Sequence, residues 1–133
     1  MEEALYLTEL IDLSILQEMQ DSFSKMTGIA SYITDTEGNY ITEGSHLTDF
    51  CTKYTCSTEE GCTRCRTCDA NSIKYAFSRG TSITYHCHAG LRNFAAPIIM
   101  ENKLVGCIFG GQFLDSAPDD DKLRSLALEI GVN

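Results

Sequence analysis

The first long periodic segment of the chain runs from Leu10 to Met26. Apolar residues recur in it at steps of three and four, which is the spacing of one face of an amphipathic helix. Ser14 followed by Gln17 matches a capping box, and Gly28 is placed to end the helix in a left-handed conformation. The pattern predicts an N-terminal amphipathic helix that serves in packing or in a dimer contact.

Five runs have the β-branched and aromatic content of strands. Residues 35–39 have turn chemistry and predict a hairpin, and Glu101 to Lys103 predicts a second one. Glycines in the last run indicate a bulge, or a place where backbone or ligand approaches closely. The predicted strands are residues 29–34, 40–42, 81–86, 93–100 and 104–114.

A second helix is predicted from about Thr58 to Ser78. Cys65, Asp69 and Ile73 are spaced four apart and share one face of it if it is continuous, although Gly61 weakens continuity at its start. A further helix begins at residue 121 and runs into the end of the sequence. The chain is therefore expected to be a fragment of a longer protein.

The order of these elements is helix, two strands, helix, three strands. It predicts an α+β fold, PAS-like or GAF-like, with a five-stranded antiparallel sheet, helices on one side and an N-terminal amphipathic helix. At 133 residues the chain is expected to form a single domain over residues 1–133.

Charge and hydropathy limit the classes of partner. The sequence has no apolar run near the ~20 residues that a bilayer requires, so no membrane association is expected. Its acidic N-terminus is not a secretory signal, which favours a cytoplasmic protein. The net charge is −9 with no basic stripe, and this excludes binding of nucleic acid by the domain.

The stretch from Cys51 to Leu91 holds six of the seven cysteines and two of the three histidines. In the cytoplasm such thiols are more often reduced or metal-bound than paired as disulfides. The triplet at 62, 65 and 68 could hold a soft metal such as zinc, or an iron–sulfur cluster with a distant fourth ligand. The other interpretations are a redox-active Cys-x-x-Cys pair and buried, inert thiols. The candidate metal ligands are Cys51, Cys65, Cys68 and Cys87, with His88 as an alternative to Cys68.

Strand alternation sends Tyr85 and Cys87 to one face, and His86 and His88 to the other. Cys87 and His88 can therefore act on one ligand only if the strand has ended before them, which Gly90 makes plausible. A catalytic thiol enzyme would need a base beside a reactive cysteine, and only Cys87 with its histidine neighbours suggests one.

With these residues in view, the sequence resembles the PocR sensory-domain family, from about Leu10 to the end of the chain. The string from Cys87 to Leu91, followed by Ala95-Ala96-Pro97-Ile98, is the most specific part of the match. Other matching positions are Leu16, Gln17, Phe23, Thr27, Gly28, Ile33, Thr34, Asp35, Gly38, Phe50, Cys51, Gly61, Arg64, Cys65, Asp69, Tyr85, His86, Gly110, Gly111 and Gln112.

The resemblance implies a PAS-type ligand-sensing domain of a transcription regulator or histidine kinase, with simple hydrocarbon derivatives such as alcohols and diols as effectors. It places characteristic polar positions at Cys51, Cys65, Asp69, Cys87 and His88. Cys56, Cys62 and Cys68 depart from the general pattern.

The sequence therefore predicts a non-catalytic binding module, with a pocket between the sheet and the cysteine-bearing helix. It is expected to act as a homodimer and to pass effector occupancy to an output domain through the N-terminal helix. The alternative is a zinc or iron–sulfur redox sensor built on the four candidate ligands. The predicted ligand-binding residues are Tyr85, His88, Phe94, Phe113 and Asp69.

Overall fold

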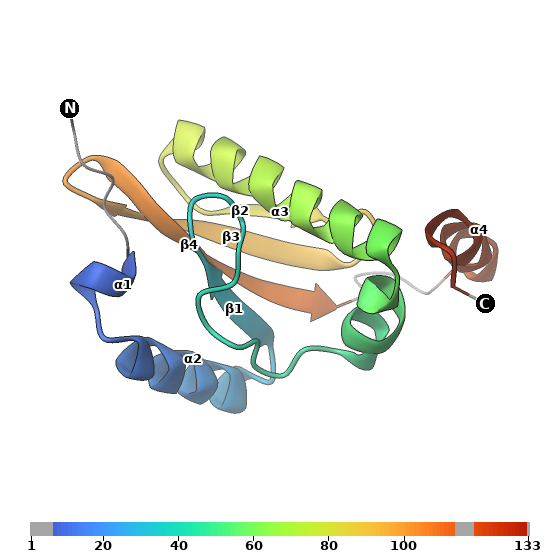
Figure 1. The fold of residues 1–133 in the computed structure, drawn as a ribbon, viewed down its shortest axis with the longest axis horizontal. Coiled ribbons are helices and arrows are strands. Elements are labelled where there is room, and N and C mark those ends of the chain that lie inside the picture. Colours follow the sequence, from blue (N-terminus) through green and yellow to red (C-terminus); the bar gives the residue numbers. More distant parts are fainter. Residues whose placement is uncertain (1–6, 114–118, 133) are drawn as a thin grey trace.

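The computed structural model describes residues 7–113 and 119–132, without the side chains of residues 8, 9 and 113. A sheet runs through the middle of the domain, and its helices lie around it (Figure 1). The elements are α1 (Leu7–Leu10), α2 (Leu13–Thr27), β1 (Ala30–Thr34), the π-helical turn η1 (Phe50–Tyr54), the 3₁₀ turn η2 (Thr55–Ser57), α3 (Glu59–Arg79), β2 (Ile83–His86), β3 (Arg92–Met100), β4 (Lys103–Phe113) and α4 (Asp120–Ile130).

The sheet has the order β1-β4-β3-β2, and every neighbouring pair is antiparallel. The predicted turn between β3 and β4 is present, with Glu101 and Asn102 both at positive φ, as a tight hairpin turn requires. The α+β class is thus confirmed.

The described residues form four strands in place of the predicted five. Residues 40–42 make only isolated bridges to β1, between Thr34 and Tyr40 and, further on, between Ser31 and Ser45. The Thr42 hydroxyl accepts a hydrogen bond from the Ile33 amide and bonds to the Gln20 side chain. Backbone hydrogen bonds to β1, such as that from the Ile41 amide to the Ile33 carbonyl oxygen, are present but do not continue as the ladder that a fifth strand would need.

The prediction of helices on one side of the sheet was wrong, because helices cover both faces. Tyr32 and Ile33 are neighbours in β1 and therefore point to opposite faces. Tyr32 joins a core with Ile73 of α3, while Ile33 joins a core with Leu16 of α2. The first core consists of Tyr32, Ile73, Ala95, Cys107 and Phe109, and the second of Leu7, Leu16, Ile33 and Val105. Both faces of the central strands are apolar, so helices must bury both of them.

Helix α2 occupies the segment predicted to be helical, but its cap is Asp12 and not Ser14. The Asp12 carboxylate accepts hydrogen bonds from the backbone amide and the hydroxyl of Ser14. Aspartate is as good a cap as serine, and here it comes two residues earlier. Gly28 ends the helix at φ 75°, as predicted.

The entry to α3 is a tight turn that also anchors α4. The Thr58 hydroxyl accepts from the Gly61 amide and donates to the Ile130 carbonyl oxygen, at 3.1 and 2.5 Å. Arg64 forms ion pairs with Glu60 and with Glu129 of α4. The last described helix is therefore attached to the first turns of α3, as its place beside that end of α3 in Figure 1 shows.

Candidate functional site

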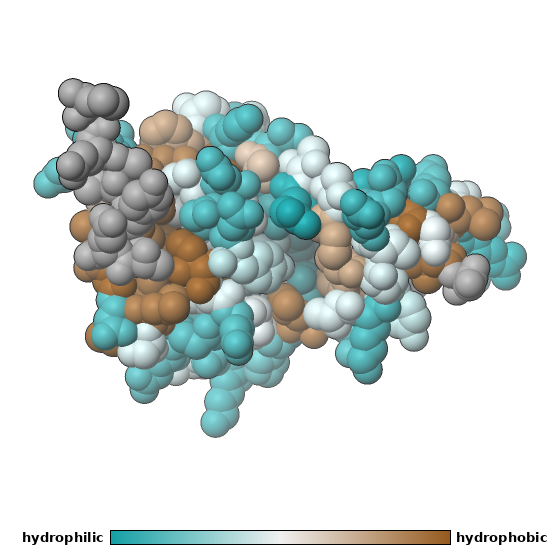
Figure 2. All heavy atoms as spheres, viewed as in Figure 1, coloured by the Kyte–Doolittle hydropathy of each residue, from teal (hydrophilic) through white to brown (hydrophobic). Residues whose placement is uncertain are grey.

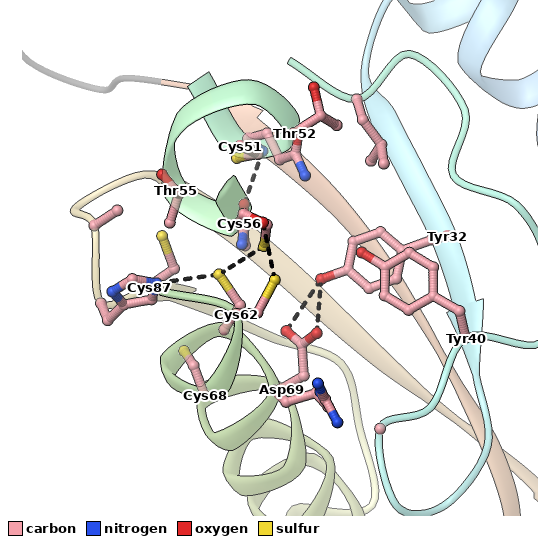
Figure 3. Close-up of a pocket in the computed structure, with 18 of the residues that line it drawn as sticks. Tyr32, Tyr40, Cys51, Thr52, Thr55, Cys56, Cys62, Cys68, Asp69 and Cys87 are labelled. Atoms are coloured by element: carbon pink, nitrogen blue, oxygen red, sulfur yellow. Dashed lines mark hydrogen bonds between the residues drawn. The ribbon is translucent and has the colours of Figure 1, made fainter. Parts of the chain in front are cut away.

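A pocket of about 450 Å³ opens on the face of the sheet that α3 covers. Its walls come from the sheet, the first half of α3, the turns η1 and η2, and two loops, around residues 38–40 and 87–89 (Figure 3). This volume lies in the range of small-molecule sites. The lining residues are Tyr32, Gly38, Asn39, Tyr40, Leu47, Cys51, Thr52, Thr55, Cys56, Cys62, Cys65, Arg66, Cys68, Asp69, Cys87, His88, Ala89, Asn93 and Gln112.

A buried carboxylate and a tyrosine hydroxyl meet in this pocket. The Tyr32 hydroxyl donates to both oxygens of Asp69, at 3.0 and 3.1 Å, as the dashed lines of Figure 3 show. The Tyr32 ring is stacked between Tyr40 and Phe109, with centroid distances of 4.5 and 5.0 Å. The stack fixes the ring, so the hydroxyl is held in place beside Asp69.

Burial controls the ionisation of Asp69, whose residue is only 7% exposed. Desolvation raises its pKa to about 7, although the Tyr32 hydrogen bond opposes the shift; the nearby Cys56 adds a smaller increase. The carboxyl group therefore changes charge near neutral pH. It can donate a hydrogen bond to a ligand when protonated and accept one when ionised.

Three thiols and one imidazole form a contact network in the pocket wall. The Sγ atoms of Cys56 and Cys65 lie 3.5 Å apart, and Cys65 Sγ lies 3.1 Å from His88 Nε2. The Cys62 thiol donates to the Cys56 carbonyl oxygen at 3.1 Å. The buried Nδ1 of His88 has no hydrogen-bond partner among the described residues. Side chains from η2, α3 and the loop after β2 are thus in contact with one another in the pocket wall.

The thiols of this network differ in acidity. The hydrogen bond between the two thiols lowers the pKa of Cys56 to about 6, whereas the same contact raises the pKa of Cys65. Burial raises the pKa of Cys51 to about 11 and also raises that of Cys68. Burial, with the positive Arg64 nearby, lowers the pKa of His88 and favours its neutral form.

All four predicted metal ligands line the pocket. Strand β2 ends at His86, and the turn closed by Cys87 and Gly90 brings Cys87 and His88 to the same pocket, as Gly90 suggested. Over residues 7–113 and 119–132, however, no three Cys, His, Asp or Glu side chains form a group that could hold a metal ion.

Of the five predicted ligand-binding residues, two line the pocket, two do not, and the side chain of one is not described. Asp69 and His88 line the pocket. Tyr85 packs against the neighbouring core, and its buried hydroxyl has no partner among the described residues. Phe94 turns to the opposite face because it alternates with Asn93, and its ring covers Gly110. The side chain of Phe113 lies outside the described part of the structure.

Several lining residues were not predicted, among them Asn93 and Gln112. The side-chain oxygen Oδ1 of Asn93 accepts a hydrogen bond from the backbone amide of Gln112 at 2.7 Å. The side-chain oxygen Oε1 of Gln112 accepts one from the backbone amide of Thr48 at 2.8 Å. The strand register shifts here, opposite Gly111, whose φ is 123°. The Gly110-Gly111-Gln112 string was the available signal, because its glycines did predict a bulge.

Comparison with known proteins decides the family. Residues 9–133 match the family described as the sensory domain found in PocR. The chain belongs to the PocR sensory-domain family. It is 30% identical over 98 residues to the regulatory protein PocR of Salmonella typhimurium strain LT2. The aligned region covers 74% of this chain and 32% of that protein. The chain thus spans about a third of the length of this relative, and the family it belongs to is one of sensory domains.

The fold also has a solved counterpart. The GAF domain/HD domain protein from Geobacter sulfurreducens superposes with a TM-score of 0.51 at 13% identity, covering 92% of this chain and 94% of that one. This likeness concerns the fold alone. No helix among the described residues is long and apolar enough to cross a bilayer.

Proposed function

We propose that this PocR-family domain senses a small hydroxylated organic molecule, such as a short alcohol or diol, in the pocket beside α3. The observation that carries this proposal is the buried Asp69–Tyr32 pair at the wall of a pocket of about 450 Å³. The domain is a cytoplasmic binding module and not an enzyme, and it regulates an attached transcription-factor or kinase output.

The chemistry of the walls suits such a ligand. Asp69 and Asn93 offer hydrogen-bonding groups on one side, and Leu47 and the Tyr40 ring offer apolar surface. A carboxyl group and an amide in a mostly apolar pocket can orient two hydroxyl groups while the carbon chain is removed from water. Such polar groups also disfavour alkanes, which would remove them from water without adding a hydrogen bond.

The test is a thermal unfolding screen against alcohols and diols of two to five carbons. We expect at least one diol to raise the unfolding midpoint in a saturable way, since a ligand that binds only the folded state stabilises it. Asp69→Ala should weaken binding about tenfold or more, and Glu18→Ala, at an exposed site on α2, should not. Equal binding by Asp69→Ala, or no stabilisation by any compound, would contradict the proposal.

The alternative function, a zinc or iron–sulfur redox sensor, is supported by the position of Cys51, Cys65, Cys68 and Cys87 around one pocket. Zinc bound by thiolates would add to folding stability, so a chelator would lower the unfolding midpoint. Elemental analysis and an absorbance spectrum of protein purified without oxygen or chelator separate the two functions. About one zinc, or iron with sulfide, per chain would favour the metal sensor.

The turns η1 and η2 lie between the pocket and α4, so they can transmit the effect of a bound effector to α4. The turns η1 and η2 contribute Cys51, Thr55 and Cys56 to the pocket, and their other side faces α4 across an apolar gap of about 100 Å³. Thr55 lines both spaces and is 2% exposed. We propose that an effector shifts η1 and η2, and with them α4, between two positions.

A homodimer through α2 is the proposed assembly. Ile15, Met19 and Met26 lie on its outer side and are 52%, 64% and 83% exposed, an unusual stripe for a surface helix. Figure 2 also shows hydrophobic surface around α1 and on α4. Such an apolar stripe is suited to packing against its counterpart in a second copy.

We expect Met19→Asp to dissociate the dimer, because a buried, unpaired carboxylate opposes association. Light scattering after size exclusion should show the mass of the variant falling to one chain. Leu128→Asp, at a still more exposed apolar site on α4, is the matched control and should leave the dimer intact. A monomeric wild type, or equal effects of the two substitutions, would refute the α2 interface.

A further inference from the structure

Two cysteines that are nine residues apart in sequence lie side by side in the pocket wall. Cys56 belongs to η2 and Cys65 to the second turn of α3, and their Sγ atoms are 3.5 Å apart. A disulfide has a sulfur–sulfur bond of about 2.05 Å, so these atoms need to approach by about 1.5 Å. A rotation about the side-chain bonds or a small shift of η2 can supply that distance.

The backbone holds the two segments together independently of the thiols. A Cβ atom on Gly61 would lie 1.8 Å from the Thr55 carbonyl oxygen, so η2 packs directly on the first turn of α3 where only glycine fits. The Thr58 cap closes the same turn. Cys56 is therefore fixed opposite Cys65 in the folded domain.

The neighbouring thiols are placed differently. The Cys62 thiol is engaged with the backbone carbonyl of Cys56. Cys62 also lies near enough to Cys56 to lower its pKa, but less than Cys65 does. Cys68 is one turn further along α3, and the thiol–thiol hydrogen bond among the described residues joins Cys56 to Cys65. The structure thus selects a pair that the Cys-x-x-Cys spacing does not select.

We propose that Cys56 and Cys65 form a reversible disulfide when the domain reacts with a hydroperoxide, and that this bond regulates the pocket they line. The inference does not depend on the identity of the organic effector. It assigns a second input, an oxidant, to the wall of the same pocket, since both residues line it.

The reaction balances as a two-electron oxidation. The Cys56 sulfur attacks one peroxide oxygen, the O–O bond breaks, and water (or an alcohol from an alkyl hydroperoxide) leaves, which makes Cys56 a sulfenic acid. The Cys65 sulfur then attacks the Cys56 sulfur, the S–O bond breaks, and water leaves as the disulfide forms. His88 Nε2, 3.1 Å from Cys65 Sγ, is placed to take the thiol proton in the second step, and this proton then leaves with the Cys56 oxygen as water.

Peptide mapping of the oxidised wild-type domain tests the assignment. The reduced protein is treated with a slight excess of hydrogen peroxide in the presence of a chelator, alkylated, and digested with trypsin and a glutamate-specific protease. Cleavage after Glu60, Arg64 and Arg66 places Cys56, Cys62 and Cys65 in separate peptides. We expect one linked pair, between the peptides of Cys56 and Cys65, which dithiothreitol releases.

Variants and a reactivity measurement complete the test. Cys56→Ser and Cys65→Ser should abolish the link, and Cys62→Ser, the matched control, should retain it. The rate of alkylation of Cys87, which lines the same pocket, should change at least threefold on oxidation. A link that involves Cys62 or Cys68, a link between chains, no link, or an unchanged Cys87 rate would each overturn the proposal. Peptide mapping of the wild-type protein tests the Cys56–Cys65 link even if a variant fails to fold.

Discussion

Asp69→Asn should stabilise the domain most at pH 8, clearly less at pH 5, and hardly at all below pH 4. In the folded protein burial raises the Asp69 pKa to about 7 from its ordinary value of 3.8. The folded state therefore binds the proton more tightly than the unfolded state. The stability that this group contributes is complete below about pH 4 and is lost as the pH rises to about 7. Asparagine removes that loss, because it carries no charge at any pH.

The size of the effect follows from the pKa shift. A shift of about three units corresponds to ~4 kcal/mol, and an observed gain of roughly 2–4 kcal/mol at pH 8 is expected after local relaxation. Urea unfolding of metal-free wild type and variant at pH 5, 6, 7 and 8 measures it. A difference in unfolding free energy that stays constant over this pH range, or a variant less stable than wild type at pH 8, would show that burial does not raise the pKa of Asp69.

Replacing Gly61 with alanine should destabilise the domain and damage the pocket together. The new Cβ would lie 1.8 Å from the Thr55 carbonyl oxygen, a backbone atom that cannot move without moving η2. Alanine is the better helix former by up to ~1 kcal/mol, but overpacking against the backbone costs more. We expect a net loss of roughly 2–4 kcal/mol, measured by urea unfolding.

Gly80→Ala is the control for the loss of a glycine as such. Gly80 caps α3 at φ 68°, with nothing within 4 Å of an added Cβ, so its substitution should cost only about 1 kcal/mol of backbone strain. If Gly61→Ala were as mild as Gly80→Ala, the close packing of η2 on α3 would not be needed for stability. The inference that this packing shapes the pocket would then be wrong as well.

Local patterns were enough to predict most of the regular structure. The helix predicted from Thr58 to Ser78 is α3, Glu59–Arg79, and the strand predicted at residues 93–100 is β3, Arg92–Met100. The shared face of Cys65, Asp69 and Ile73 is also correct, since Asp69 and Ile73 are buried and Cys65 lines the pocket. Periodicity and capping are properties of neighbouring residues, and here they determined these elements.

Features that depend on distant contacts were not predicted. Gly61 was interpreted as a weak point in a helix, whereas it is the place where η2 touches α3. The turns η1 and η2 have no sequence period, and the Cys56–Cys65 contact exists only because they fold back onto α3. The second helical cover of the sheet likewise depends on packing of Leu16 against Ile33, which spacing along the chain does not reveal.

Thr55 lies between two spaces, one that receives the effector and one that receives α4. If binding on one side changes how firmly α4 is held on the other, linkage requires that a constraint on α4 change the affinity for the effector by the same factor. Whatever is joined to α4 is then itself an allosteric ligand of the pocket. The threshold concentration at which the sensor responds would be a property of the joined protein, so the same domain could be retuned by a different attachment without any change in the residues that touch the effector.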